Sequence, residues 1–513
     1  MTKIRLALLA AVASGVIGGG YAFAAGGNDA AIRQNGDGNV ASINQSAGTD
    51  NQFNNTGPSD ASAAFQDGNN NSITAVQSGS SNAVGLTGNQ FNTIEAVTGK
   101  IGHTSVNRPG WGVPAQNYDA DATTGVAQIG DDNSLDVTQE IGGNIVGGVV
   151  QFSSSARSVA GQKNELEINQ LGGSGNRINQ VLQAVAQGSQ NTATITQDGS
   201  GNVINAVNQI GLNVSGSNSD VNSITATIIG DSNGTAALSR KASASGAATS
   251  ELNQMGEDNS ITLNIDGSLN AFGVTQNNYG GGRNTLSALK ITGDSNQLGV
   301  LQDANKASGN HNTLTISEID GNNNNIGVKQ IGNNSGTIDL QSASNSNLIG
   351  LSQTGTNSAT ITITSGDSND FDALQEDYNQ LTITANGSSN ILKTMQTASV
   401  SGTDNELTVD ILGSSNNTTG FSTANAADAI GLAAGELVQT GYGNEATITV
   451  GDSLASTNSN NNSFALSQLG NLNEATISIS GGDSNQVAVL QSGNSNNSVV
   501  TQTGSSNVVG IAQ

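Results

Sequence analysis

Glutamine, glycine and asparagine recur along the 513-residue chain in one fixed pattern, Q-x-G-x-x-N. A side-chain amide both donates and accepts hydrogen bonds, so identical amides stacked about 4.8 Å apart can bond one to the next. A buried amide without a partner would cost on the order of 1–3 kcal/mol. The chemistry that this pattern favours is therefore amide stacking between repeated units. The full pattern starts at Gln34, Gln66, Gln77, Gln128, Gln197, Gln254, Gln439, Gln468, Gln491 and Gln502.

The spacing predicts the size of the repeated unit. Where the rhythm is clean, at Gln330, Gln353, Gln375 and Gln396, the steps are 23, 22 and 21 residues. Other G-x-x-N turns lie between these, so one unit holds two turns and two strands. The glycines supply turn conformations that residues with a Cβ resist. The expected ladder and turn residues are Gln34, Gly36, Asn39, Gln254, Gly256, Asn259, Gln330, Gln353, Gln375, Gln396, Gln468, Gly470, Asn473, Gln491, Gly493, Asn496, Gln502, Gly504 and Asn507.

The segments between turns alternate apolar and polar residues. Residues 462–468 and 485–491 read N-x-h-x-h-x-Q, whereas residues 444–450 and 473–479 carry an apolar residue in place of the Gln. A period of two predicts strands whose Asn, apolar and Gln side chains point to one face. One such unit cannot bury its apolar face alone, so the units must stack. We therefore expect an all-β solenoid, amyloid-like and cross-β, with two strands per coil of about 22–23 residues and about twenty coils.

The N-terminal residues predict export. Lys3 and Arg5 precede an apolar run over residues 6–17, and Ala22-Phe23-Ala24 fits a cleavage site, so residues 1–24 are expected to be a signal peptide. No later segment is long and apolar enough to span a membrane. Residues 25–513 are expected to form one solenoid outside the cell.

Charge and cysteine content exclude several classes of partner. The leader holds two of the fifteen Lys and Arg residues and none of the forty Asp and Glu residues, so the remaining chain has a net charge of −27. This balance opposes binding to nucleic acid or anionic lipid, which requires clustered cations. The chain has no cysteine and therefore no disulfide.

Three segments break the rhythm and are expected to leave the solenoid as loops. Residues 101–124 contain His103, Trp111 and two of the three prolines, and proline cannot donate to a strand ladder. Residues 235–250 and 417–435 are rich in Ala, Ser and Thr and lack the motif. The third of these segments could form a short helix.

The sequence offers no group of residues suited to catalysis. His103 and His311 lie far apart, the acids are scattered, and no nucleophile elbow, phosphate loop or metal-spaced cluster occurs. We expect no enzyme activity and no cofactor. Two other readings stay open, calcium at the recurring G-D-S-N turns and an ice-binding array of outward threonines. For the turns, the simpler expectation is that each Asp bonds its own backbone. These turns hold Asp231, Asp294, Asp367 and Asp483, and the threonine pairs are Thr194/Thr196, Thr360/Thr362, Thr382/Thr384 and Thr447/Thr449.

The Q-x-G-x-x-N turns, two strands per coil and inward amides together resemble the curlin repeat of curli fibre subunits. The resemblance covers most of residues 28–513. It implies a stacked β-solenoid that is secreted through an outer-membrane pore with accessory proteins and polymerises into the amyloid of a biofilm matrix. The chain departs from the family in its length, in its G-D-S-N turns and in a glycine-rich export segment reduced to Gly26-Gly27. Main subunit, nucleator and surface-tethered variant are all compatible with these departures.

Both ends of the repeat appear in the sequence without a polar cap. Such ends would present unpaired backbone and amides, and natural sheets usually hide these edges. We hypothesise that the last coil of one molecule templates the first coil of the next, giving a head-to-tail homopolymer. The alternative is a cell-surface solenoid adhesin that does not polymerise. The expected polymerisation edges are Asn28, Ile32 and Gln34 at one end, and Asn507, Ile511 and Gln513 at the other.

Overall fold

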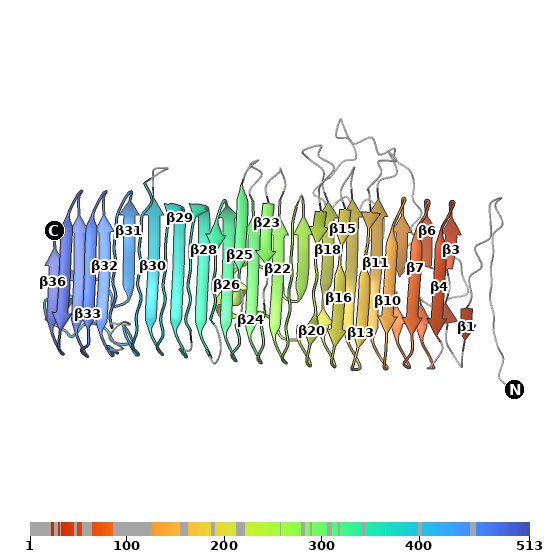
Figure 1. The fold of residues 1–513 in the computed structure, drawn as a ribbon, viewed down its shortest axis with the longest axis horizontal. Helices are drawn as coiled ribbons and strands as arrows, with labels where there is room; N and C mark the ends of the chain where they lie inside the picture. Colours follow the sequence, from red (N-terminus) through yellow and green to blue (C-terminus); the bar gives the residue numbers. More distant parts are fainter. Residues whose placement is uncertain are drawn as a thin grey trace, which may run out of the picture.

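The computed structural model shows one long stack of parallel strands, with β1 near one end and β36 at the other (Figure 1). It describes residues 22–513 apart from 25–28, 31, 46–48, 54–63, 86–124, 154–162, 186–189, 212–220, 257, 279–282, 288–289, 305–309, 317–318, 341–343, 365, 399–402 and 452–457. Almost all regular structure is strand. The predicted all-β stacked solenoid is confirmed.

The strands form two layers that face each other, which we name layer A and layer B. Layer A contains a seven-stranded sheet and three shorter sheets. Its strands are β1 (Ala22–Ala24), β4 (Val40–Gln45), β7 (Ser72–Gln77), β10 (Ser134–Gln139), β12 (Lys163–Asn164), β13 (Glu167–Leu171), β15 (Gln190–Thr192), β16 (Thr194–Asp198), β19 (Val221–Ser223), β20 (Ile228–Ile229), β23 (Arg283–Ser287), β25 (His311–Thr315), β27 (Ser335–Gly336), β33 (Glu474–Ser480) and β35 (Asn497–Thr503).

Layer B runs through the whole stack. Its strands are β2 (Asp29–Ala30), β3 (Ile32–Asn35), β5 (Gln52–Phe53), β6 (Ala64–Asp67), β8 (Ala83–Val84), β9 (Val126–Ile129), β11 (Ile145–Ser153), β14 (Arg177–Val185), β17 (Val203–Ile204), β18 (Ala206–Gly211), β21 (Glu251–Met255), β22 (Ala271–Asn277), β24 (Gln297–Asp303), β26 (Asn325–Gly332), β28 (Leu348–Asn357), β29 (Asp370–Asn379), β30 (Ile391–Ala398), β31 (Glu436–Gly441), β32 (Ser463–Leu469), β34 (Gln486–Ser492) and β36 (Val508–Ala512).

Successive coils pair in register, so equivalent motif residues lie side by side. Gln302 in β24 pairs with Gln330 in β26, and Gln330 pairs with Gln353 in β28. A shift of one residue would turn every apolar side chain out of the core, so the alternating pattern fixes this register.

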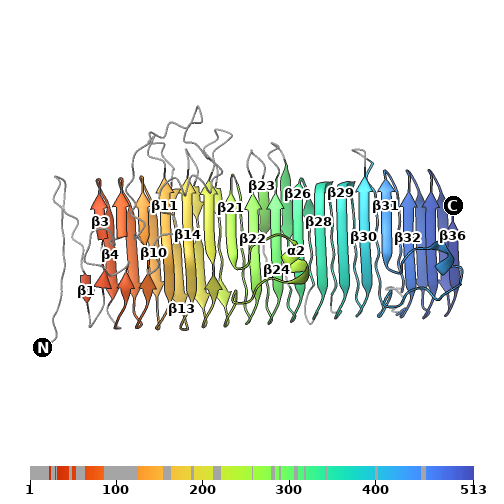
Figure 2. The same cartoon turned by 180° about the vertical axis from the view of Figure 1, so that it is seen from behind.

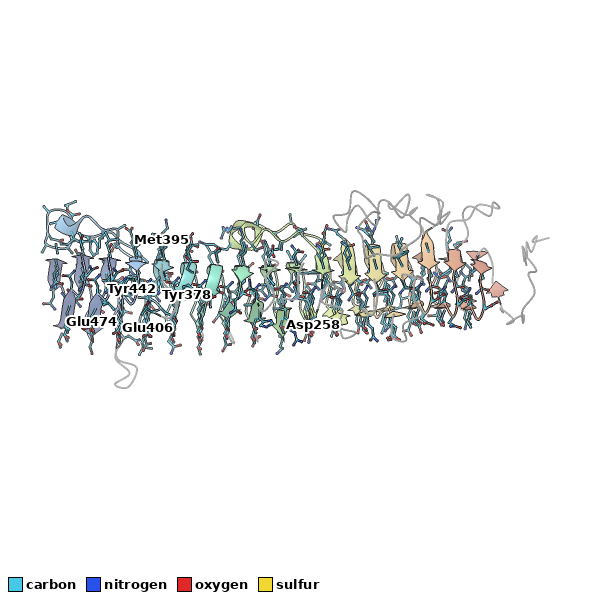
Figure 3. The ribbon with its side chains drawn as sticks, turned by 90° about the horizontal axis from the view of Figure 1, so that it is seen from above. Asp258, Tyr378, Met395, Glu406, Tyr442 and Glu474 are labelled. Carbon is cyan, nitrogen blue, oxygen red and sulfur yellow. The ribbon has the colours of Figure 1, made fainter. Side chains whose placement is uncertain are left out.

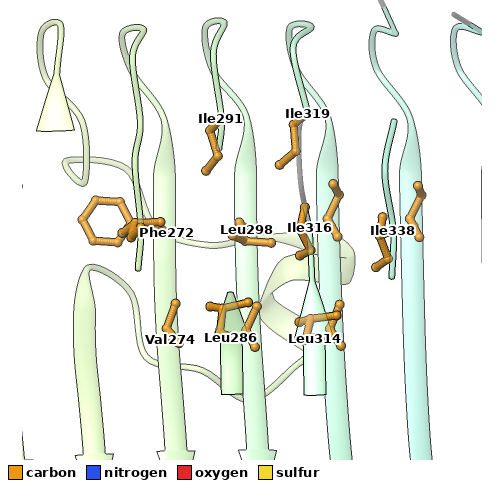
Figure 4. Packing of buried hydrophobic residues seen from close by; sticks show 14 of the residues in the cluster. Phe272, Val274, Leu286, Ile291, Leu298, Leu314, Ile316, Ile319 and Ile338 are labelled. Atoms are coloured by element: carbon orange, nitrogen blue, oxygen red, sulfur yellow. The ribbon is translucent and has the colours of Figure 1, made fainter. Parts of the chain in front are cut away.

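The core is a narrow seam between the layers (Figure 4). Phe272 and Val274 from layer B face Leu286 from layer A, and all three side chains are fully buried. One continuous apolar cluster extends along the stack from Ile43 to Val500. Each coil therefore buries its apolar residues both against the facing layer and against the coils before and after it.

Two excursions lie on the outer face of layer B (Figure 2). Residues 235–250 include the helix α2 (Arg240–Ala244), which packs on β24, β26 and β28. Residues 417–435 include the 3₁₀ helix η2 (Asp428–Ile430), which packs on β34 and β36. We call these segments strap 1 and strap 2. The third expected loop, residues 101–124 with Trp111, lies outside the described residues.

Strap 1 lies close to a row of glycines in layer B. A Cβ added at Gly299 would lie 2.0 Å from the carbonyl oxygen of Ala242, and one at Gly327 would lie 1.7 Å from that of Lys241. The Lys241 ammonium also reaches Asp370 at 3.6 Å and Asp372 at 3.1 Å. Because glycine has no side chain, the backbone of strap 1 can lie directly on layer B at these positions.

Candidate assembly site: amide ladders and open strand edges

The layer B glutamines form one unbroken ladder from β3 to the last residue. Sixteen bonds of 2.6 to 3.3 Å join seventeen residues, each donating from Nε2 to Oε1 of the next coil. Among the described residues the ladder has seventeen positions, fewer than the expected number of about twenty coils, and the excursions at residues 235–250 and 417–435 account for part of the difference. The members are Gln34, Gln66, Gln128, Gln151, Gln183, Gln209, Gln254, Gln276, Gln302, Gln330, Gln353, Gln375, Gln396, Gln439, Gln468, Gln491 and Gln513.

Most ladder amides also bond the backbone of the facing layer. Nε2 of Gln353 donates to the carbonyl oxygen of Ser335 at 3.0 Å, and Nε2 of Gln468 donates to that of Glu445 at 2.7 Å. Both amide hydrogens are thereby used inside a dry core. This arrangement explains how so polar a chain can be ordered, since the amides meet their requirement for partners without water.

Two asparagine ladders run in the opposite sense. Asn347 donates to Oδ1 of Asn324 in the preceding coil through both its backbone N–H and Nδ2, each at 3.0 Å. The same pair of bonds links Asn507 to Asn485 at 2.9 and 3.0 Å. The glutamine donors thus point towards the C-terminal end, whereas the asparagine donors point towards the N-terminal end. The two end faces consequently differ in their donors and acceptors.

The second asparagine ladder, along the start of the layer A strands, includes Asn39, Asn473 and Asn496. Asn496 donates to Oδ1 of Asn473 at 3.0 Å. Asn259 is also a member, but its contact with Asn222 is long, 3.4 Å, and its buried Oδ1 has no partner. The ladder is weakened at this coil.

The expected turn glycines have the backbone that the motif requires. Gly36, Gly256, Gly470, Gly493 and Gly504 all have positive φ angles, between 90° and 120°. This left-handed region strains any residue with a Cβ. At these five turns the glycine is therefore a conformational requirement, whereas Gly79, in the motif that starts at Gln77, does not have a positive φ angle.

One expected ladder residue does not join a ladder. Gln502 in β35 pairs in register with Ile479, and neither its Nε2 nor its Oε1 has a hydrogen-bond partner although the side chain is only 4% exposed. The motif could not reveal this, because Gln502 has the same local sequence as the true ladder residues. Gln502 stays unpaired because its neighbour in the preceding coil is Ile479, which cannot form a hydrogen bond with an amide.

The turns contain a further ladder that the sequence reading missed. The backbone N–H of Ser268 donates to Oδ1 of Asp294 at 2.7 Å, and that of Asp294 donates to Oδ1 of Asn322 at 2.7 Å. The turn aspartate therefore accepts from the preceding coil, and the expectation that it bonds its own backbone was wrong. The sequence does contain a sign of this ladder, because the turn position that accepts the bond is occupied by Asp, Asn or Ser, each with a side-chain oxygen that can accept a hydrogen bond. The series runs Ser200, Asp231, Ser268, Asp294, Asn322, Asn345, Asp367, Ser388, Ser414, Asn460, Asp483 and Ser505.

At the C-terminal end, two strands have one neighbour each among the described strands. β35 pairs with β33, and β36 pairs with β34. Ile511 is half-buried and Gln513 is exposed. This end of the stack presents free strand edges in both layers.

At the N-terminal end, β2 pairs with β5, and β3 with β6. Ile32 is half-buried against the core, Gln34 is exposed, and Asn28 lies outside the described residues. In layer A, β4 pairs with β7 and also with β1, whose Ala24 lies opposite Gln45. Removal of residues 22–24 would open the layer A edge of the first coil.

Both layers also have an outer face, with side chains that point away from the core. Glu406 and Glu474 lie on the outer side of layer A and Met395 on that of layer B (Figure 3).

Burial, with a smaller effect from Glu167 in the adjacent strand, raises the pKa of Asp136. Burial alone raises the pKa of Asp410. In the part of the chain that the structure describes, no group of three or more His, Cys, Asp or Glu residues could hold a metal ion.

Together these features define a class of protein, a parallel β-solenoid whose coils are joined by core amide ladders. Residues 482–513 match the family model of the curlin associated repeat. These matched residues form the last coils of the stack, so this part of the chain carries a repeat of the curlin type. No curated protein matches the chain. Across the described residues, no helix is both long and apolar enough to cross a membrane.

Proposed function

We propose that this protein is the structural subunit of an extracellular amyloid-type fibre that grows head-to-tail through its terminal coils. The family match supports a curli-like fibre subunit, since the curlin repeat is a structural repeat and not a catalytic one. Export by the predicted signal peptide would place the fibre outside the cell, where it would serve biofilm matrix and adhesion.

The observation that carries the proposal is the polarity of the amide ladders. Every glutamine of this ladder donates from Nε2 towards the C-terminal end, so Gln34 begins the ladder as a donor. Its Oε1 faces the N-terminal end, where it could accept a bond from a glutamine of another copy. Gln513 ends the ladder as an acceptor for Gln491. One end can therefore supply the donor that the other requires. In this ladder two C-terminal ends would present donor to donor and two N-terminal ends acceptor to acceptor, so all subunits should point the same way along the filament.

The test is to incubate the purified exported chain, image it and record fibre diffraction. The expected result is unbranched filaments with a reflection near 4.8 Å along their axis. Deleting residues 493–513 and adding a charged cap should suppress growth. A chain that stays monomeric at high concentration would contradict the proposal and favour a non-polymerising surface adhesin.

A further inference from the structure

The buried amide of Gln502 shows which strands meet when two copies join. This inference rests on the proposed head-to-tail assembly and concerns the geometry of its joint. Gln502 lies in a layer A column six residues after each ladder asparagine. Near the N-terminal end this column is a glutamine ladder, in which Gln45 donates to Gln77 at 2.8 Å and Gln77 to Gln139 at 2.9 Å. Further along, the column becomes apolar, ending with Ile479.

A glutamine reappears in this column only where β35 has no further neighbour among the described strands. Its amide is buried, unpaired and stacked on an isoleucine. Apolar residues fill the same position in the coils before it, so the core there does not require an amide. A second copy with Gln45 next to Gln502 would supply the missing partner and continue the ladder as Gln502, Gln45 and Gln77.

Strand order then imposes a condition on the joint. Apart from β1, which belongs to the predicted leader, the described stack begins with a layer B strand, β2–β3, and also ends with a layer B strand, β36. Stacking β36 directly on β2–β3 of a second copy would leave layer A one strand short, with an empty place between β35 and β4. If β35 of the first copy instead pairs directly with β4 of the second, β36 of the first copy and β2–β3 of the second come to the same place in layer B, where only one strand fits.

β36 is the better fixed of these two strands. β2–β3 pairs in two short pieces, two residues with β5 and four with β6, and Ala30 and Gln34 are exposed. β36 pairs with five residues of β34, lies under η2, and is fixed by Gln513, whose Oε1 accepts from Ser498 Oγ at 3.0 Å.

We infer that β36 of one copy replaces β2–β3 of the next, so that β35 pairs with β4 and Gln502 with Gln45. The next copy exchanges one layer B strand for another of the same pattern, N-x-h-x-h-x-Q. Gln513 of the first copy takes the place of Gln34 and donates to Gln66 Oε1 of the next copy, so the ladder keeps its direction. The β35–β4 pairing then replaces the pairing between β36 and β2–β3 that direct stacking would make, and layer A is left without an empty place. β1 covers part of the β4 edge and would have to leave first, as cleavage of the predicted leader would ensure.

Cross-linking distinguishes the two joints, because the chain has no cysteine of its own. In the inferred joint Val499 of one copy lies beside Ser42 of the next, both on the exposed outer face of layer A. Neighbouring strands are about 4.8 Å apart, within the Cα separation that a disulfide spans, whereas an empty place between them would set the Cα atoms about 9.6 Å apart. The V499C/S42C chain, assembled and oxidised with copper phenanthroline, is expected to give a ladder of covalent multimers. Filaments without such multimers would overturn the inference. Single-cysteine variants are the control.

Two further variants test the contributions of the strands. Gln502→Ile restores the residue type of the preceding coil, so the melting temperature should not fall while seeded elongation slows about tenfold, as expected for one lost amide bond. Deletion of residues 25–35 removes β2–β3 and should leave elongation as fast as before or faster. Unchanged elongation of Gln502→Ile, or arrested elongation of the folded deletion variant, would overturn the inference. Failure of the unaltered chain to form filaments would instead refute the proposed function.

Discussion

The backbone N–H of Ser268 donates to Oδ1 of Asp294 in the next coil at 2.7 Å. This contact ties two exposed turns together across the stack. It gives the G-D-S-N turn a structural role in which the carboxylate acts as a hydrogen-bond acceptor for a neighbouring coil. The calcium reading of these turns is therefore unnecessary to explain why the position holds Asp, Asn or Ser.

Asp294→Ala should destabilise the adjoining coils by about 1 kcal/mol, because the Ser268 N–H loses its acceptor. Asp294→Asn keeps an oxygen at the same place and should be close to neutral. Hydrogen exchange at Ser268 and the melting temperature measure the effect. Equal stability of the two variants would contradict a role as acceptor.

Removal of divalent cations should leave the protein unchanged. The turn aspartates already accept backbone hydrogen bonds, and a structural calcium is not needed to hold them in place. The expected melting temperature is the same with EDTA and with millimolar calcium. A rise of several degrees in calcium that Asp294→Asn abolishes would show that the turns bind the ion.

Gln330→Leu should be among the more damaging core substitutions. It leaves one of the two N–H groups of Gln302 Nε2 without its acceptor and the Oε1 of Gln353 without its donor, and both side chains are fully buried. Two unpaired buried groups correspond to about 2–4 kcal/mol. Lys329→Ser, one residue away on the outer face where Ser352 stands in the next coil, is the matched control and should be nearly neutral. Local hydrogen exchange around β26 would measure both.

Gly327→Ala should lift strap 1 from layer B. Its Cβ would lie 1.7 Å from the backbone oxygen of Lys241, and the strap backbone must move to make room. We expect about 1–3 kcal/mol of destabilisation and faster proteolysis within residues 235–250. Gly350→Ala is the control, since its Cβ would meet only the side-chain ends of Asp372 and Lys241 at 3.0 and 3.1 Å, and these can turn aside. Similar proteolysis of both variants would refute this account of the glycine row.

Asp136→Asn should raise stability at neutral pH. Burial and the neighbouring Glu167 raise the pKa of Asp136 in the fold, so the folded state binds the proton more tightly than the unfolded chain. Below the ordinary pKa of about 3.9, Asp136 is protonated in both states and does not lower the free energy of unfolding. As the pH rises through the raised pKa of the folded state, its charged carboxylate lowers the free energy of unfolding. The stability gained by the variant should appear over that interval and vanish at pH 3. A gain that is the same at pH 3 and pH 7 would exclude this cause.

The sequence by itself determined the coil. Its period of two separated the core face of the strands from the outer face, its glycines marked turns, and its amides indicated ladders. The period did not reveal that β11, β18 and β32 also bury residues of the outer face. These features are local, because a residue's face and turn geometry depend on neighbours a few positions away. The repeat was therefore readable without coordinates.

Tertiary structure decided which residues of neighbouring coils meet. Gln66 bonds Gln128, 62 residues later, because β8 and β9, which lie far apart in the sequence, both pair with the one strand β11. Gln502 has the same motif as Gln491, yet it stacks on Ile479 and stays unpaired, whereas Gln491 bonds Gln468 and Gln513. The turn ladder and the straps likewise join residues of different coils. An amide's partner is set by the coil beside it, and the local motif carries no record of that neighbour.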